Sequence, residues 1–129
     1  MKIFDCFQFF DEDMMLDLRL NILNDYVDKF VIVENLFMHS GTKKKQNFKI
    51  ENFKKFQNKI EYILVDQLPK DLLDIKKIPL ERRASRVIDN TLKIEHNQRN
   101  KILEGLKDSD DNDLILISDV DEIPNLKDI

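Results

Sequence analysis

Four short apolar runs along the chain predict four strands. They cover residues 2–10, 30–33, 60–65 and 114–118, and each is too short to be stable as an isolated helix. β-branched and aromatic residues are frequent in these runs, which favours strands. The runs at 30–33 and 114–118 contain almost no polar position, so we expect both to be buried strands.

Helical patterns occupy the segments between these runs. Acidic residues at 11–13 predict a helix start. Apolar residues then follow at spacings of three and four and predict one buried stripe: Met15, Leu18, Ile22 and Tyr26. We expect a short helix at 52–59 and a long one at 81–106. Because strands alternate with helices, the pattern predicts an α/β fold with a mostly parallel sheet.

Three acidic residues, Glu34, Asp66 and Asp119, lie at predicted strand ends. In open α/β folds, ligands bind outside the carboxyl ends of the strands. Only two glycines occur in the chain, which excludes a glycine-rich phosphate loop of the GxGxxG or Walker type. No internal repeat or linker interrupts the 129 residues, so we expect one domain.

Composition and charge narrow the class of protein further. Hydrophobic residues make up 42% of the chain, enough for a real core rather than a disordered segment. A net charge of -4 gives no reason to expect nucleic acid or an anionic membrane as a partner. The sequence contains neither an apolar span of membrane length nor a basic leader before a hydrophobic stretch. With the single Cys6 expected as a buried thiol in a reducing compartment, we expect a cytoplasmic location.

The most informative stretch is LILISDVDEIP, residues 114–124. On an extended segment Asp119 and Asp121 point the same way, while Val120 turns into the core. Two carboxylates at the end of a rigid strand suit a hard divalent cation such as Mg²⁺ or Mn²⁺. The remaining coordination positions are then open to water or to the oxygens of a diphosphate. The placement directly after a buried strand makes this Asp-x-Asp triplet a candidate metal site.

Two other functions fit the same stretch less well. Residues 108–119 partly match a calcium-binding loop, but Asp113 stands where that loop needs glycine and Asp119 where it needs glutamate. Phosphatases of the haloacid dehalogenase family also carry an Asp-x-Asp after a strand. Theirs lies near the first strand and is followed by Gly-Thr, which residues 119–124 lack.

The predicted long helix carries a charged pair within an apolar stripe. One face holds Ile88, Leu92, Glu95, Arg99, Ile102 and Leu106. The four-residue spacing lets Glu95 pair with Arg99. At about 1.5 Å per helical residue and about 3.3 Å per strand residue, we expect this pair to reach the level of the acidic stretch. It is either a buried ion pair that fixes packing or a charge partner for the carboxylates or a bound phosphate.

Five blocks of sequence stand in a distinctive order and spacing. They read KIFDCFQFFDEDMMLDLRLNIL, VDKFVIVEN, HSGTKK, EHNQRNKILEGL and DNDLILISDVDEIP. In this order they resemble the N-terminal part of glycosyltransferase family 17, over nearly the whole chain. That family includes the β-1,4-mannosyl-glycoprotein β-1,4-N-acetylglucosaminyltransferases. The resemblance implies a GT-A-like, Rossmann-type αβα sandwich, UDP-N-acetylglucosamine as donor, Mn²⁺ (or Mg²⁺) as metal and inversion at the anomeric carbon.

The resemblance also implies roles for individual residues. Carried over by position, Asp119 and Asp121 hold the metal and, through it, the donor diphosphate. Glu34 is expected to contact uridine. Arg99 is expected to face the diphosphate and Glu95 to orient Arg99. Glu122 either helps to hold the metal or is solvated.

The resemblance finally implies what the chain does and what it lacks. In inverting GT-A enzymes the general base and the acceptor-binding residues follow the acidic motif, whereas here only residues 125–129 follow it. We therefore expect residues 1–129 to form one GT-A-like nucleotide-sugar-binding domain, truncated after the Asp-x-Asp strand. The predicted function is metal-dependent transfer of N-acetylglucosamine from UDP-GlcNAc to a glycan acceptor. The alternative is a catalytically inactive nucleotide-sugar-binding or assembly module, and an unfinished sheet favours a homodimer.

Overall fold

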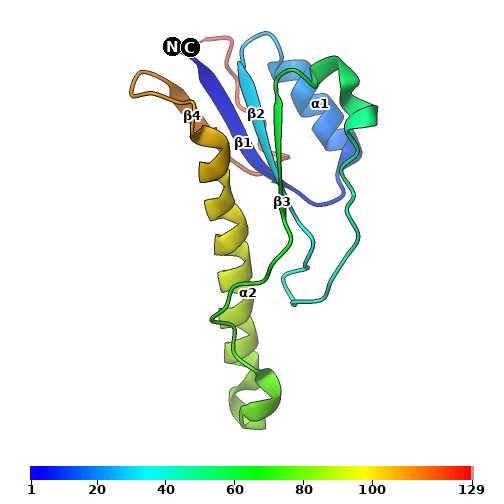
Figure 1. Cartoon of the computed structure of the whole chain (residues 1–129), viewed down its shortest axis with the longest axis vertical. Coiled ribbons are helices and arrows are strands. Elements are labelled where there is room, and N and C mark those ends of the chain that lie inside the picture. Colours follow the sequence, from blue (N-terminus) through cyan, green and yellow to red (C-terminus); the bar gives the residue numbers. More distant parts are fainter. Residues whose placement is uncertain (129) are drawn as a thin grey trace.

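The computed structural model describes residues 1–128 and contains one four-stranded sheet (Figure 1). The strands are β1 (Ile3–Phe9), β2 (Lys29–Asn35), β3 (Ile60–Val65) and β4 (Leu114–Ile117). The α-helices are α1 (Asp13–Leu23) and α2 (Arg83–Asn100), and four 3₁₀ segments complete the set: η1 (Ile50–Phe56), η2 (Ile75–Lys77), η3 (Leu80–Arg82) and η4 (Lys101–Leu106). The four predicted strands are thus confirmed.

All strand pairs are parallel, in the order β3-β2-β1-β4. The chain builds the sheet outward from β1 through β2 to β3 and then returns to place β4 on the other side of β1. The central residue Cys6 consequently pairs with Val31 of β2 and with Ile117 of β4. Strand order reverses between β1 and β4, and such a switch point is where open α/β sheets bind ligands.

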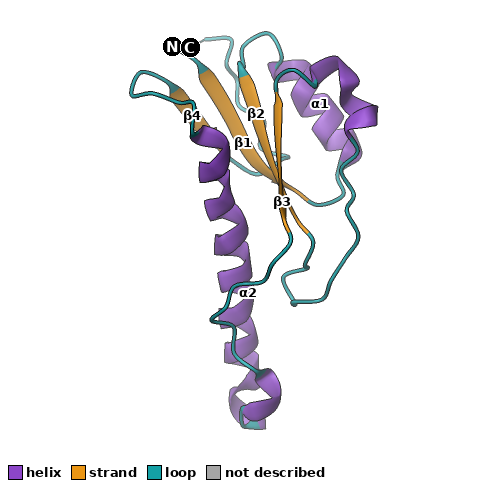
Figure 2. Ribbon diagram, in the orientation of Figure 1, coloured by secondary structure: helices purple, strands orange, loops and turns teal. Residues whose placement is uncertain are grey.

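Side-chain alternation gives the sheet two apolar faces, each covered by a different layer. Phe7, Phe9 and Ile32 point to one face and pack with buried residues of α1 and η1. Phe4 and Cys6 point to the other face and pack with Ile102 of η4. Helical segments therefore cover both faces, as the secondary-structure view also indicates (Figure 2). The prediction of an α/β Rossmann-like fold is confirmed.

The predicted buried stripe of the first helix is wrong. Leu18, Ile22 and Tyr26 are 48%, 47% and 41% exposed. The face that meets the sheet instead carries Leu16, Arg19, Leu20 and Leu23. The helix has apolar residues on several sides, and Arg19 lies on the inward face, where it pairs with the buried Asp5 of β1.

The predicted stripe of the long helix is also wrong over its first half. Ile88 is 60% and Leu92 44% exposed, whereas Ile94 and Gln98 are buried. The first turns of α2 extend beyond the end of the sheet (Figures 1 and 2), so no strand lies there to cover them. Ile102, from the end of the predicted helix, is buried against the sheet as expected.

The last strand is less buried than its sequence predicts. Leu114, Ile115 and Leu116 are partly exposed, and Ile117 is 57% exposed. The reason is topological, because β4 is an edge strand and among residues 1–128 its one partner strand is β1.

Candidate functional site

A pocket of about 810 Å³ lies at the carboxyl end of the sheet, at the β1/β4 switch point. Six segments contribute to its wall: the end of β1 and the residues after it, the first turn of α1, the end of β2, the loop that follows β2, the middle of α2, and the turn after β4. The lining residues are Gln8, Phe9, Phe10, Glu12, Met15, Asn35, Phe37, Met38, His39, Ser40, Glu95, Gln98, Asp119, Val120 and Asp121. The fold thus brings the acidic stretch to the place predicted for a ligand.

The acidic stretch forms a turn, not the extended segment that was predicted. The N–H of Glu122 donates to the carbonyl oxygen of Asp119 at 2.9 Å, which closes the turn. The carboxylate of Glu122 in turn accepts a bond from the N–H of Asp119 at 2.9 Å. Val120 is buried, as expected, while Asp119 and Asp121 are exposed and both line the pocket.

The two pocket aspartates have the donor set for a divalent cation. Within residues 1–128 neither carboxylate accepts a hydrogen bond, so four oxygens remain available as hard ligands. No cluster of three or more His, Cys, Asp or Glu side chains forms a metal cage in the described part of the chain. Two carboxylates fit a hard cation whose other positions are taken by water or by a ligand's oxygens.

Glu95 and Arg99 pair on α2 beside the acidic turn. Their side chains are 3.2 Å apart and are 33% and 48% exposed. Glu95 lines the large pocket, and Arg99 lines a neighbouring pocket of about 280 Å³ together with Ser118 and Asp119. The predicted pairing of Glu95 with Arg99 is therefore confirmed, and so is the prediction that the pair lies level with the acidic stretch. The alternative of a buried ion pair is wrong, because both side chains reach solvent.

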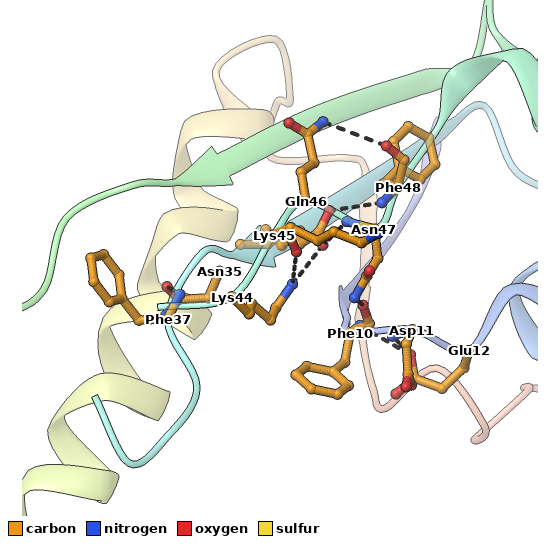
Figure 3. A network of polar contacts seen from close by, with 12 residues as sticks. Phe10, Asp11, Glu12, Asn35, Phe37, Lys44, Lys45, Gln46, Asn47 and Phe48 are labelled. Atoms are coloured by element: carbon orange, nitrogen blue, oxygen red, sulfur yellow. Dashed lines mark hydrogen bonds and ion pairs between the residues drawn. The ribbon is translucent and has the colours of Figure 1, made fainter. Parts of the chain in front are cut away.

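Glu34 lies inside the protein rather than on the pocket wall. Its side chain is fully buried. One oxygen accepts from Lys44 Nζ and the Asn47 N–H, both at 2.7 Å, and the other accepts from the Phe48 N–H at 3.0 Å and the Tyr62 hydroxyl at 2.7 Å. Figure 3 shows Lys44, Asn47 and Phe48 gathered in this network. In this structure the Glu34 carboxylate fastens the segment that follows β2.

The protonation of this network is set by burial and by hydrogen bonds in opposition. Burial alone would raise the pKa of Glu34, but the bonds from Lys44, Asn47, Tyr62 and Phe48 outweigh it and hold that pKa below its usual range. Burial, followed by the bond and the charge of Glu34, raises the pKa of the Tyr62 hydroxyl. Both effects keep Glu34 ionised, so that it can accept four hydrogen bonds, and Tyr62 protonated, so that its hydroxyl can donate one of them.

Sequence patterns missed the buried pair of Asp5 and Arg19. Both side chains are fully buried, and their closest atoms are 2.6 Å apart. The same guanidinium also reaches the backbone of the acidic turn, donating to the carbonyl oxygen of Asp119 at 2.7 Å. The sequence does contain a signal for this pair. Asp5 and Arg19 carry opposite charges within two consecutive apolar segments, and burying either charge without the other costs too much free energy.

No helix in residues 1–128 combines the length and the apolar character needed to cross a bilayer.

The fold and the pocket define the class of the protein. The parallel α/β sheet makes this a Rossmann-like protein, and a ligand-sized pocket lies at its switch point with two carboxylates that accept no hydrogen bond within residues 1–128. The chain belongs to glycosyltransferase family 17, whose family model matches residues 1–129. This confirms the resemblance and supports glycosyl transfer, with a nucleotide sugar and an acceptor as substrates. Searches of curated proteins and of solved structures gave no significant match.

Proposed function

We propose that this chain binds the nucleotide-sugar donor of a metal-dependent, inverting glycosyltransferase. Asp119 and Asp121 would hold a divalent cation, Mn²⁺ or Mg²⁺, which would supply positive charge for the donor's diphosphate. The observation that carries the proposal is a pair of carboxylates on the wall of the switch-point pocket that accept no hydrogen bond within residues 1–128. Carboxylate oxygens and phosphate oxygens together make the all-oxygen shell that such cations prefer.

The size and the chemistry of the pocket support a nucleotide sugar. A volume of about 810 Å³ falls within the range of roughly 300–1,000 Å³ typical of small-molecule sites. Phe10, Phe37 and Met38 supply apolar wall for a base or a sugar face, and the acidic turn lies on the same pocket. The donor we propose is UDP-GlcNAc, the one implied by the family resemblance, and the acceptor is a glycan.

The residues of the chain act by positioning and by charge. Asp119 and Asp121 anchor the metal, which when bound neutralises charge on the departing diphosphate. Arg99 stands beside the same turn and attracts phosphate oxygens, while Glu95 holds the guanidinium at 3.2 Å. Glu34 acts on the nucleoside end through the loop that it fastens, since its own oxygens already accept four bonds.

Calorimetric titration with UDP, with and without MnCl₂, tests the proposal. We expect UDP to bind at least about ten-fold more tightly with Mn²⁺, a difference of about 1.4 kcal/mol. Asp121→Asn should remove this metal dependence, because an amide is a weaker ligand than a carboxylate. Asp111→Asn, at an exposed acidic position before β4, is the matched control and should behave as the wild type. Equal UDP affinity with and without metal would overturn the metal-bridge role.

The second candidate is a binding or assembly module that retains the donor site without transfer. The observation that favours it is the edge strand β4, whose Ile117 is 57% exposed and whose outer side has no partner strand among residues 1–128. Retained UDP binding without sugar transfer, together with a dimer in sedimentation, would select this candidate. A monomer that transfers GlcNAc would eliminate it.

A further inference from the structure

We propose that Arg19 and Asp5 are positioning residues that set the conformation of the acidic turn, residues 118–122. The inference rests on the proposed function, because the turn matters only if Asp119 and Asp121 bind the metal. Arg19 comes from α1 and Asp5 from β1, about a hundred positions from the turn in sequence. The pair therefore joins the first β-α unit to the segment that follows the last strand.

The first step is the geometry of the pair itself. Arg19 Nε donates to one oxygen of Asp5 at 2.8 Å and Nη2 donates to the other at 2.6 Å, a two-bond fork. Both side chains are fully buried, and the guanidinium lies over the ring of Phe7 at 4.6 Å. Asp5 thus neutralises Arg19 and fixes the plane of its guanidinium.

The second step is what the remaining donors of Arg19 reach. Nη1 donates to three backbone carbonyl oxygens, those of Asp119 at 2.7 Å, Val120 at 3.2 Å and Glu122 at 2.9 Å. Nη2 donates to the hydroxyl of Ser118 at 2.6 Å. One planar group therefore contacts four of the five residues of the turn, and it contacts no aspartate side chain there.

The third step is the consequence for the carboxylates. Three carbonyl groups of the turn accept hydrogen bonds from the buried guanidinium of Arg19. The backbone on both sides of Asp121 is therefore held against the core. Val120 is drawn inward, and the side chains of Asp119 and Asp121 remain on the exposed side of the turn at the pocket. Since Asp5 already balances the charge of Arg19, the guanidinium is not a competing counterion for the two aspartates.

Lysine cannot replace this fork. An ammonium group is a point charge without a planar arrangement of donors, so it cannot bond Asp5 and three carbonyls at once. Arg19→Lys should therefore keep the charge and loosen the turn. The stability control is Leu23→Ala, on the same helix and in the same buried cluster, because it weakens the core and leaves the hydrogen bonds from Arg19 to the turn in place.

Hydrogen exchange measured by mass spectrometry tests the positioning role without any ligand. In Arg19→Lys we expect exchange in peptides covering residues 118–123 to rise at least about ten-fold more than exchange in β2. In Leu23→Ala we expect any rise to be similar in both regions. A rise in the turn no greater in Arg19→Lys than in Leu23→Ala overturns the proposal.

A second variant separates positioning from stability. Asp5→Leu combined with Arg19→Met replaces the buried pair by apolar side chains, an exchange that can leave stability unchanged or improved. We expect this folded variant to show the same loose turn and Mn²⁺ affinity, measured by electron paramagnetic resonance, lowered at least about ten-fold. Wild-type exchange and wild-type Mn²⁺ affinity in the double variant would overturn the proposal. If the wild type binds no Mn²⁺ or UDP, the proposed function fails, while the exchange comparison still decides the role of Arg19 in the turn.

Discussion

Replacing Glu34 by glutamine tests how the loop beside the pocket is held. The carboxylate accepts four bonds, and two of the donors, Lys44 Nζ and the Asn47 N–H, share one oxygen. The other oxygen accepts from the Phe48 N–H and the Tyr62 hydroxyl. A glutamine of the same shape must turn its NH₂ group toward one of these two pairs.

The structure determines which orientation the glutamine takes and what it costs. Toward Lys44 and Asn47 the NH₂ group meets only donors, so it turns toward Phe48 and Tyr62, where the hydroxyl can rotate to accept. The buried Phe48 N–H then loses its partner, at about 1–3 kcal/mol, and Lys44 exchanges its ion pair with the carboxylate for a bond to an uncharged amide oxygen, at about 1 kcal/mol more. We expect Glu34→Gln to lower the free energy of unfolding by about 2–4 kcal/mol. That is a large share of the roughly 5–15 kcal/mol typical of a domain.

Urea unfolding followed by circular dichroism measures this loss, and its pH dependence identifies the cause. The folded-state pKa of Glu34 lies below its ordinary value of 4.5. The ionised group therefore stabilises the wild type above pH 4.5, and this stabilisation is lost as the pH falls through the folded-state pKa. Glu34→Gln has no such group, so the difference between the two proteins should be constant above about pH 5.5 and narrow below pH 4.5.

Asp113→Asn is the matched control for this experiment. Asp113 also accepts two backbone N–H bonds, from Lys2 at 2.8 Å and Asp110 at 2.9 Å, and these bonds hold its pKa below the usual range. The carboxyl is exposed, however, so water can replace it, and we expect a smaller loss than for Glu34→Gln. A loss below about 1 kcal/mol in Glu34→Gln, or a difference that stays constant as the pH falls, would refute the account of the network.

Two further predictions concern the core. A Cβ added at Gly105 would lie 2.5 Å from Cγ1 of the buried Val31, so Gly105→Ala should cost about 1–3 kcal/mol in urea unfolding. Combining it with Val31→Ala should recover part of that loss, and strict additivity of the two changes would contradict the predicted clash. Burial, followed by the charge of Asp5, raises the pKa of the Cys6 thiol to about 12. Ellman's reagent should therefore label Cys6 only at the rate of unfolding, and rapid labelling of the native protein would show that the thiol is accessible.

The strands were predictable because their signal is local. Runs such as Phe30–Val33 are apolar at every position, and this pattern alone predicts a strand that is covered on both faces. The buried face of α1 was not predictable from apolar spacing alone, because apolar residues occur on several sides of Asp13–Leu23. The observed inward face includes Arg19, which can be buried there because it pairs with Asp5 of another element, and that information lies outside the helix.

The exposed half of α2 has a different cause. An 18-residue helix is roughly 27 Å long and is continued by η4, whereas the seven residues of β1 span roughly 23 Å. A helix that is continued over one end of so short a sheet must extend beyond the other end. The spacing of Ile88 and Leu92 is truly helical, but amphipathic spacing says nothing about how far the partner surface reaches.

For the candidate site, the order of elements along the chain predicts which strand ends are near the ligand, but it does not predict which way each side chain points. Chain order placed Asp119 and Asp121 at a carboxyl strand end, and the structure puts both on the pocket. Its place at a predicted strand end and the family resemblance predict that Glu34 contacts the nucleoside. In the structure Glu34 is still within β2, and its side chain points to the same face of the sheet as Ile32. The next residue, Asn35, points to the opposite face and lines the pocket. One step along a strand therefore separates a structural carboxylate from a residue on the pocket wall.

Two ion pairs with fully buried carboxylates, Asp5 with Arg19 and Glu34 with Lys44, each hold an irregular segment in place. Each pair costs desolvation, so neither is an efficient way to stabilise a core. Each instead also bonds backbone groups of an irregular segment, and other residues of the segment bound by Glu34, at positions 37–40, line the pocket. Glu34 binds the N–H groups of Asn47 and Phe48, and Arg19 binds the carbonyls of residues 119, 120 and 122. Apolar contacts can bury such segments but cannot fix the directions of their peptide groups, whereas a carboxylate and a guanidinium can. We infer that the buried charges of Glu34 and Arg19 serve to fix one conformation in each of these two irregular segments. In the second segment the carboxylates of Asp119 and Asp121 line the pocket and accept no hydrogen bond within residues 1–128.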